Sequence, residues 1–322
     1  MRKISLLSTA VLSFAMLTGG VTQALAQGAF PEREVTIVVP FNPGGASDMT
    51  SRIIAKGLEA PLGKPVVVTN KAGGSGGVGM SQVARGTPDG YTLSYIPVEL
   101  VMHKALKLSD LGPTSFEFIG LVTMVPAAVT VPADAPYNTI AEFIKYAKDN
   151  PGKVRVGNSG TGSIWHIAAS ALEINQGVIF NHIPFEGAAP AVTALMGKHI
   201  EAVSVNAGEV KAGLDAGKLK ILAVMTPQRD PAFPNVPTLI ESGIKLEFAG
   251  WGGFGAPRGT PKPVVDKLAA ALQKAASTDE FKNFIVSRGM IVQYRSPEEA
   301  VKFVDDQYVF FNDLLSKMEL GK

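Results

Sequence analysis

Residues 35–48, Val35-Thr36-Ile37-Val38-Val39-Pro40-Phe41-Asn42-Pro43-Gly44-Gly45-Ala46-Ser47-Asp48, decide the fold. The β-branched run at the start predicts a buried strand, and the Pro/Gly segment after it predicts a loop. A helix is expected from about Asp48 to Glu59. The same order returns at residues 154–174, with a strand to Gly157, a Gly/Ser loop and a helix from Ile164. Each half of the chain therefore contains a strand, loop and helix unit.

Further strands and helices alternate around these two units. Strands are expected at 65–69, 91–96, 202–205 and 221–225, with helices between them and a mainly helical end after Pro261. Such alternation is typical of parallel α/β structure. We therefore predict a fold of the α/β class, and a chain of this length suits two lobes better than one. Each lobe would be a mainly parallel sheet flanked by helices, with the ligand cleft between the lobes.

Two segments look like crossings between lobes, Leu121 to Val131 and Phe248 to Pro257. If the chain enters the second lobe once and returns once, residues 27–124 and 248–322 form lobe 1. Residues 125–247 then form lobe 2. Closure about two crossing segments is ordinary hinge geometry.

The first 26 residues read as a signal peptide. Arg2 and Lys3 precede an apolar run from Ile4 to Met16, and Ala24-Leu25-Ala26 matches a small-x-small cleavage site. The apolar run is shorter than the roughly 20 residues that a membrane-spanning helix needs. We expect cleavage near Ala26 and a periplasmic product.

Composition narrows the classes of function. The chain has no cysteine, so disulfides and thiolate chemistry are excluded. It has 30 basic and 28 acidic residues; without Arg2 and Lys3, 28 of each remain. No basic run suggests nucleic acid or a membrane surface as partner. The histidines at 103, 166, 182 and 199 show no metal-ligand spacing, and we predict neither a metal nor a cofactor.

The two Gly/Ser loops suit an anion. The first N–H groups of a helix have no partner inside the helix, and the helix dipole adds about half a positive charge there. Two such helix starts facing one cleft, from residues 41–48 and 159–166, would grip a carboxylate with main-chain amides. The simpler interpretation is that Ser47 and Ser163 only cap their helices. Asp48 either complements the helix dipole or binds a donor at the cleft edge.

The sequence also resembles a known family, the tripartite tricarboxylate transporter receptors of the Bug or TctC type. The matching segments are residues 30–41, Pro43-Gly44-Gly45-Ala46-Ser47-Asp48, 87–93, Gly160-Thr161-Gly162-Ser163 with His166, 184–187 with Pro190-Ala191, and 253–260. The resemblance implies a two-lobed type II periplasmic binding protein fold. It also implies a receptor that is not an enzyme: it captures a small di- or tricarboxylate or aromatic acid and delivers it to membrane permease subunits. We expect a monomer.

Loop positions carried over from this resemblance, together with neighbouring side chains, give the predicted ligand-binding set. It consists of Phe41, Asn42, Gly44, Gly45, Ala46, Ser47, Asp48, Ser159, Gly160, Thr161, Ser163, Trp165, His166, Phe185, Gly187, Ala188 and Asn206. Asn42, Trp165 and Asn206 look individual to this chain, which leaves the identity of the acid open. Trp165 has two interpretations, stacking on a planar ligand or core packing. His166 either bonds the ligand or braces its loop.

Two enzyme classes remain as alternatives. Gly74, Gly76 and Gly79 fit a dinucleotide fingerprint, with Glu99 at the acidic position, but the first glycine lies several residues past its strand. Residues 73–77 also fit G-x-S-x-G around Ser75, which would make a secreted serine hydrolase. Its surrounding glycines favour a loose loop over a strained nucleophile turn, and no H-G-G-G oxyanion segment is present.

Overall fold

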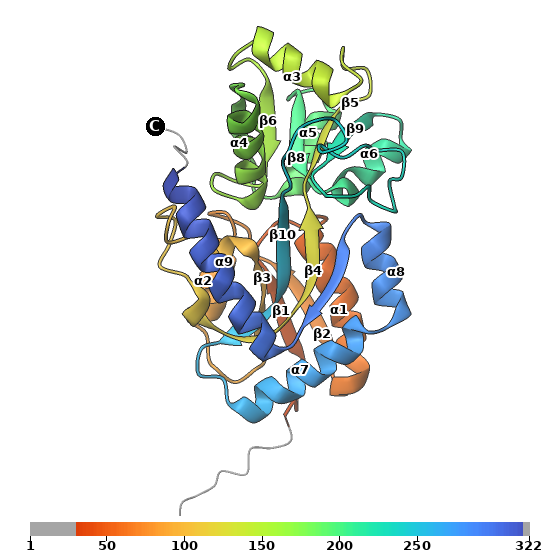
Figure 1. Ribbon diagram of the computed structural model, residues 1–322. Helices are drawn as coiled ribbons and strands as arrows, with labels where there is room; N and C mark the ends of the chain where they lie inside the picture. The colour runs from red at the N-terminus through yellow and green to blue at the C-terminus, as the bar shows by residue number, and fades with distance from the viewer. Residues whose placement is uncertain (1–29, 318–322) are drawn as a thin grey trace, which may run out of the picture. The chain divides into compact units, whose positions relative to one another are not determined.

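Six strands build the sheet of the first lobe in the computed structural model, which describes residues 30–317 (Figure 1). They are β1 (Val35–Val39), β2 (Val66–Asn70), β3 (Thr92–Pro97), β4 (Phe116–Pro126), β10 (Ala249–Pro257) and β11 (Ile291–Arg295), in the order β11-β4-β10-β3-β1-β2. Strand β1 pairs in parallel with β2 and β3. The other pairs, β10 with β3 and β4, and β11 with β4, are antiparallel.

Five strands build the sheet of the second lobe. They are β5 (Ala128–Pro132), β6 (Arg155–Asn158), β7 (Asn181–Pro184), β8 (Ala202–Val205) and β9 (Leu219–Val224), in the order β7-β6-β8-β5-β9. Strand β6 is parallel to β7 and β8, whereas β5 is antiparallel to β8 and β9. The side chains of β8 are buried throughout, as expected for a central strand covered on both faces.

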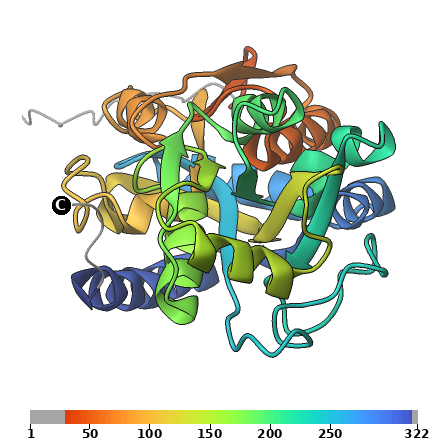
Figure 2. The same ribbon diagram turned by 90° about the horizontal axis from the view of Figure 1, so that it is seen from above.

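Helices cover the sheets. Around the first sheet lie α1 (Ala46–Leu62), α2 (Gly77–Ala84), α7 (Lys262–Ala276), α8 (Asp279–Ser287) and α9 (Pro297–Lys317), and around the second lie α3 (Ile140–Asp149), α4 (Ile164–Gln176), α5 (Ala188–Met196) and α6 (Lys211–Asp215). Short 3₁₀ turns are η1 (Val98–Val101), η2 (Pro113–Ser115) and η3 (Ala207–Val210). Viewed from above, α1 and α9 lie on opposite sides of the strands (Figure 2). Both lobes are thus layered α/β structures.

Two adjacent strands carry the chain between the lobes. Strand β4 ends in the first sheet at Pro126, and β5 begins in the second sheet at Ala128. The return strand β10 pairs with β4 along its length. An outgoing and a returning strand that lie side by side must run antiparallel. The sheets are therefore mixed, which corrects the expectation of mainly parallel sheets.

Ala127, between β4 and β5, and Phe248, just before β10, lie where the chain passes between the two sheets. The Ala127 amide donates to the Phe248 carbonyl, and its own carbonyl accepts from Met225. The C-terminal helices return to the first lobe, where a Cβ atom on Gly57 of α1 would lie 2.8 Å from Ala275 of α7. The predicted signal peptide, residues 1–26, lies outside the described residues. Within residues 30–317 no helix is both long and apolar enough to cross a bilayer.

Glycines on β10 allow side chains of neighbouring strands to lie across it. A Cβ atom on Gly252 would overlap the hydroxyl of Tyr95, and one on Gly253 would overlap the carbonyl of Gly120. Tyr95 is buried and packs edge-on against Phe254, with ring centroids 5.6 Å apart. Because β10 has no side chain at Gly252, the Tyr95 ring can extend across this strand to the space between the lobes.

We expect Gly252→Ala to lower the free energy of unfolding by about 1–3 kcal/mol, because the methyl group would displace Tyr95 from a packed site. Urea unfolding followed by circular dichroism measures this loss. Gly250→Ala is the matched control on the same strand, since its new methyl group would meet its nearest neighbour, Val98, at 3.3 Å. Equal losses in the two variants would contradict the assigned role of Gly252.

Candidate functional site

A cavity with about 450 Å³ of empty space lies between the two lobes. This space includes the part that is open to solvent. The lining residues are Phe41, Gly45, Ala46, Ser47, Tyr95, Pro97, Val98, Glu99, Val125, Ser159, Ile164, Trp165, Ala188, Glu209, Gly250 and Trp251. They come from both lobes and from the crossing strands.

Helix α1 begins at the cavity, and a glutamate of the opposite lobe meets its first amide. The N-cap is Gly45, which makes no side-chain cap; this corrects the expectation that Ser47 caps this helix. The Ala46 amide donates to Oε1 of Glu209 at 2.7 Å. Glu209 lies on η3 of the second lobe, and its Oε2 accepts from the Asn206 amide at 3.0 Å.

Helix α4 shows the reverse arrangement. Ser163 is its N-cap, and the Ser163 hydroxyl accepts from the His166 amide. The Ile164 amide donates to Oε1 of Glu99 at 2.9 Å. Glu99 belongs to η1 of the first lobe. Each lobe therefore supplies one carboxyl group to the helix start of the other, and we call these two bonds the reciprocal glutamate contacts.

The reciprocal glutamate contacts occupy positions that the sequence assigned to a ligand. Both amides belong to the first helical residue, where the helix dipole favours a negative group. The carboxyls of Glu99 and Glu209 thus bind the backbone amides of Ile164 and Ala46, where the sequence predicted the carboxylate of a ligand. A bound acid has to use other amides of the same helix starts or displace a glutamate.

Burial changes the protonation of both glutamates. The pKa of Glu99 is raised to about 7: loss of hydration raises it most, backbone hydrogen bonds partly oppose this, and the nearby charge of Glu209 adds a smaller increase. Loss of hydration likewise raises the pKa of Glu209 to about 7, although the Ala46 and Asn206 amides oppose the shift. Near neutral pH each carboxyl exchanges between its neutral and its charged form.

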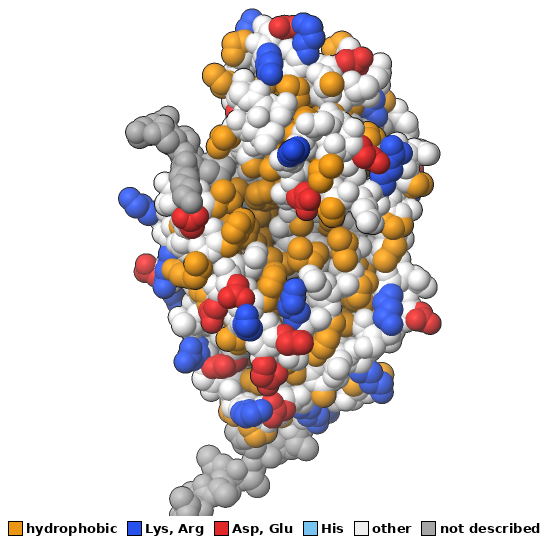
Figure 3. Space-filling model, in the orientation of Figure 1, with side chains coloured by type: hydrophobic (Ala, Val, Ile, Leu, Met, Phe, Trp, Pro, Cys, Tyr) orange, Lys and Arg blue, Asp and Glu red, His pale blue; other side chains and the backbone are white. Residues whose placement is uncertain are grey.

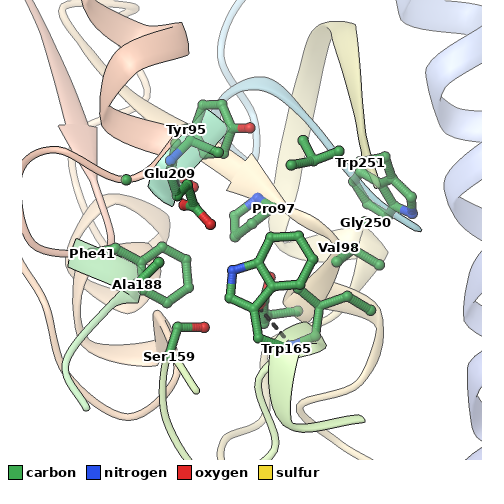
Figure 4. Close-up of a pocket in the computed structure, with 16 residues that line it drawn as sticks. Phe41, Tyr95, Pro97, Val98, Ser159, Trp165, Ala188, Glu209, Gly250 and Trp251 are labelled. Atoms are coloured by element: carbon green, nitrogen blue, oxygen red, sulfur yellow. Dashed lines mark hydrogen bonds between the residues drawn. The ribbon is translucent and has the colours of Figure 1, made fainter. Parts of the chain in front are cut away.

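Aromatic rings form much of the cavity wall. Phe41 and Trp165 face the space between the lobes, and the Glu209 carboxyl points into the area framed by Phe41, Pro97 and Trp165 (Figure 4). Trp251 lines the cavity while its indole Nε1 donates to Gln307. Hydrophobic side chains also gather over the middle of the molecular face in Figure 3, with charged groups mostly around them. The site is apolar apart from a few polar groups.

Seven predicted residues line this cavity together: Phe41, Gly45, Ala46, Ser47, Ser159, Trp165 and Ala188. Others lie where the loops of the two lobes touch. The Asn42 amide donates to the Glu186 carbonyl beside Gly187, and a Cβ atom on Gly44 would lie 3.5 Å from Ala189. At a second contact, the Ser75 hydroxyl donates to the Thr161 carbonyl next to Gly160.

Five more predicted residues also lie outside the cavity lining, and other parts of the protein engage their side chains. Asp48 accepts from the Gly44 amide, Arg52 and Asn70. The side-chain amide of Asn206 donates, through Nδ2, to the carbonyls of Pro126 and Gly289. The remaining three are Ser163, Phe185 and His166. Ser163 is the N-cap of α4, Phe185 packs over Gly157 of β6, and His166 bonds its own loop.

His166 braces its loop. Its Nδ1 accepts from the Gly162 amide at 3.0 Å, and its ring meets that of His182 edge-on at 4.6 Å between centroids. Burial, followed by the charge of His182, lowers the pKa of His166 to about 4. The ring is therefore neutral near pH 7, as an acceptor of this hydrogen bond must be.

The sequence reasoning missed Tyr95, Pro97, Val98, Val125, Ile164, Gly250, Trp251 and, above all, the two glutamates as lining residues. Glu99 interrupts the apolar run from Tyr95 to Met102, and a lone acid in such a run is a signal of a buried charge that needs partners. Glu209 follows Asn206-Ala207-Gly208, and nothing local indicates that it reaches another lobe.

The Gly-rich loop around Ser75 has a structural role here. Ser75 adopts a φ of 50°, and its hydroxyl donates to the Thr161 carbonyl at 2.6 Å. The ring of His103 contacts the Ser75 backbone carbonyl through Nε2, not the hydroxyl. A Cβ atom on Gly79 would lie 2.6 Å from the Lys71 carbonyl, so this glycine allows close packing. Among residues 30–317, no group of three or more acids, histidines or cysteines is arranged to hold a metal.

Comparison with known proteins identifies the family. The family model described as "Tripartite tricarboxylate transporter family receptor" matches residues 50–320. The chain belongs to this receptor family. The periplasmic binding protein BugD is 36% identical in sequence with a TM-score of 0.86, over 91% of this chain and 100% of BugD. This result confirms the predicted family and the two-lobed periplasmic binding protein fold.

Two further receptor-like structures contain organic acids. MatC from Rhodopseudomonas palustris, solved with bound malate, is 30% identical with a TM-score of 0.84, over 89% of this chain and 100% of MatC. A second R. palustris protein, solved with adipate, is 29% identical with a TM-score of 0.85, over 89% and 97% of the two chains. This receptor thus shares its fold with proteins whose structures contain malate or adipate.

The reciprocal glutamate contacts predict a pH dependence of stability. Because folding raises both pKa values from about 4.5 to about 7, the folded state binds more protons in this range. Compared with the Glu99→Gln/Glu209→Gln double variant, the wild type should lose stability as pH rises from 4.5 to 7. The loss should be on the order of 2–3 kcal/mol for each glutamate. Urea midpoints measured across this range test the expectation.

The glutamine pair is a suitable reference because its amide oxygens can still accept from Ala46 and Ile164 without titrating. Glu298→Gln, on exposed α9, is the matched control and should follow the wild type. Parallel pH profiles for the wild type and the double variant would show that the two carboxyls titrate normally.

Proposed function

We propose that this receptor captures a small organic carboxylate between its lobes and delivers it, chemically unchanged, to the membrane permease subunits of a tripartite transporter. This proposal rests on the cavity that lies beside the starts of α1 and α4. A third helix, α5, also begins at this cavity, at Ala188. Malate in MatC and adipate in its R. palustris relative support an acid as ligand.

Main-chain amides remain for such an acid beyond the two that the glutamates occupy. Ser47 and Trp165 are the second residues of α1 and α4, and Ala188 is the first residue of α5. N–H groups in the first turn of a helix have no partner within that helix. All three residues line the cavity. They offer a carboxylate donors from both lobes without an arginine or lysine.

Closure follows from donors that face each other across the cavity. We propose that residues 27–124 with 248–322 and residues 125–247 move as the two lobes, hinged on β4 and β10. The reciprocal glutamate contacts and the bonds Ser75–Thr161 and Asn42–Glu186 all join the lobes. A ligand that binds amides of both lobes favours the closed state because only that state satisfies all of its acceptors.

We further propose that the N-terminal leader is removed near Ala26 and that the receptor works in the periplasm as a monomer. The composition of residues 2–26 supports export. Among the site residues, Phe41, Trp165 and Ser159 would select the part of the ligand beyond its carboxylate, since their side chains line the cavity. The predicted residues that lie where the loops of the two lobes touch would affect binding by stabilising the closed state. They are Asn42, Gly44, Gly160, Thr161 and Gly187.

A panel of acids tests the proposed function. Mono-, di- and tricarboxylates and aromatic acids are compared by thermal unfolding of the mature protein. A true ligand at about a hundred times its dissociation constant should stabilise the protein by about 2.7 kcal/mol. If every acid leaves the melting temperature unchanged, or if the protein turns over an ester or a nicotinamide, the receptor proposal fails.

Gly45→Val should abolish binding of any acid found in this panel. A Cβ atom at Gly45 would lie 3.1 Å from Oε1 of Glu209, and the larger valine would also enter the approach to the α1 amides. The Gly45 backbone has a φ of −83°, which valine tolerates, so the fold should persist. Calorimetric titration measures the affinity.

Ala60→Val, on an exposed position of the same helix, is the control and should bind normally. Unchanged affinity in Gly45→Val would remove the start of α1 from the binding site.

A further inference from the structure

The ionisable side chains of the cavity include acidic groups but no basic ones. Glu99 and Glu209 are the ionisable acids among its lining residues, and the lining contains no lysine, arginine or histidine. Glu99 is only 2% exposed. For an anion receptor this is unexpected, because a plain dicarboxylate would add two negative charges beside two acidic side chains.

Neither glutamate has a cationic partner. Among the ion pairs between residues 30–317, which run from Arg33–Asp89 to Lys302–Asp306, none includes Glu99 or Glu209. Their hydrogen bonds come from backbone amides: Ile164 for Glu99, and Ala46 and Asn206 for Glu209. Amides satisfy some acceptor sites but leave the charge uncompensated, and a buried carboxylate without a counter-charge is costly.

The wall of the cavity also favours a cation. Phe41, Tyr95, Trp165 and Trp251 all line it. The face of an aromatic ring attracts an ammonium group, most strongly where water is excluded. Carboxyl oxygens accept hydrogen bonds from a positively charged nitrogen and aromatic faces attract it, whereas neither group improves a site for a simple anion.

We propose that the ligand is a zwitterionic carboxylate whose protonated amine lies between Glu99 and Glu209 against the aromatic wall. Its carboxylate binds the remaining amides at the starts of α1, α4 and α5. This inference rests on the proposed function and specifies the class of acid. The amine supplies the counter-charge that the two glutamates lack, and the glutamates exclude acids without an amine.

Matched pairs of acids test the proposal. Calorimetric titration at pH 7.5 compares glutamate with glutarate, 2-aminoadipate with adipate, and 5-aminopentanoate with pentanoate. The members of each pair differ only in the amine. We expect at least one aminated acid to bind tenfold or more tightly than its partner. If the amine-free acids bind as tightly as, or more tightly than, their partners in every pair, the proposal is overturned while the carboxylate receptor stands.

Glutamine variants link this preference to the two residues. Glu99→Gln and Glu209→Gln keep an oxygen that accepts from Ile164 or Ala46 but remove the charge. Each should weaken the aminated ligand tenfold or more and leave its amine-free partner unchanged or tighter. Glu298→Gln is the control. An unchanged preference in both folded variants would overturn the assigned role of the glutamates.

The same measurements separate the two levels of inference. Failure of all six acids, together with a silent thermal panel, would overturn the carboxylate receptor itself. Binding of amine-free acids alone would overturn only the zwitterion and would mean that protons, not a ligand amine, neutralise Glu99 and Glu209.

Discussion

The site depends on one constraint, that the first amides of α1 and α4 need acceptors which their own helices cannot provide. Each lobe meets this need with a glutamate of the other: Glu209 for Ala46 and Glu99 for Ile164. The two bonds join the lobes at the cavity between them. Closure, the geometry of the helix starts and the charge of the cavity are therefore coupled.

This coupling changes how the receptor family's general scheme applies here. A cleft of bare helix starts would suit any small acid, whereas a cleft that already contains two carboxyls favours a ligand able to compensate them. The aromatic wall of Phe41, Trp165 and Trp251 acts in the same direction. In the proposed receptor, selectivity would come as much from the charges that oppose unsuitable acids as from the amides that bind suitable ones.

The crossing strands make the arrangement possible. Strand β10 is rich in glycine, and without a side chain at Gly252 the Tyr95 ring reaches across it to the cavity. Asn206 binds the carbonyls of Pro126 and Gly289, and so ties the start of η3, which carries Glu209, to the first lobe. A residue predicted to touch the ligand instead holds the segment that presents a glutamate to α1.

Local sequence was enough to determine the α/β class, the two strand, loop and helix units and the loops that border the cavity, because β-branched runs, glycines and helical periodicity act over a few residues. The two equivalent loops also predicted that Phe41, Gly45, Ala46, Ser47, Ser159 and Trp165 lie near one another, and the family resemblance added Ala188. Only the tertiary structure decided that the sheets are mixed. It also decided that Glu99 and Glu209 each accept a hydrogen bond from a helix start in the other lobe. Ile164 follows Glu99 by 65 positions and Glu209 follows Ala46 by 163, and no local pattern encodes a contact between residues so far apart.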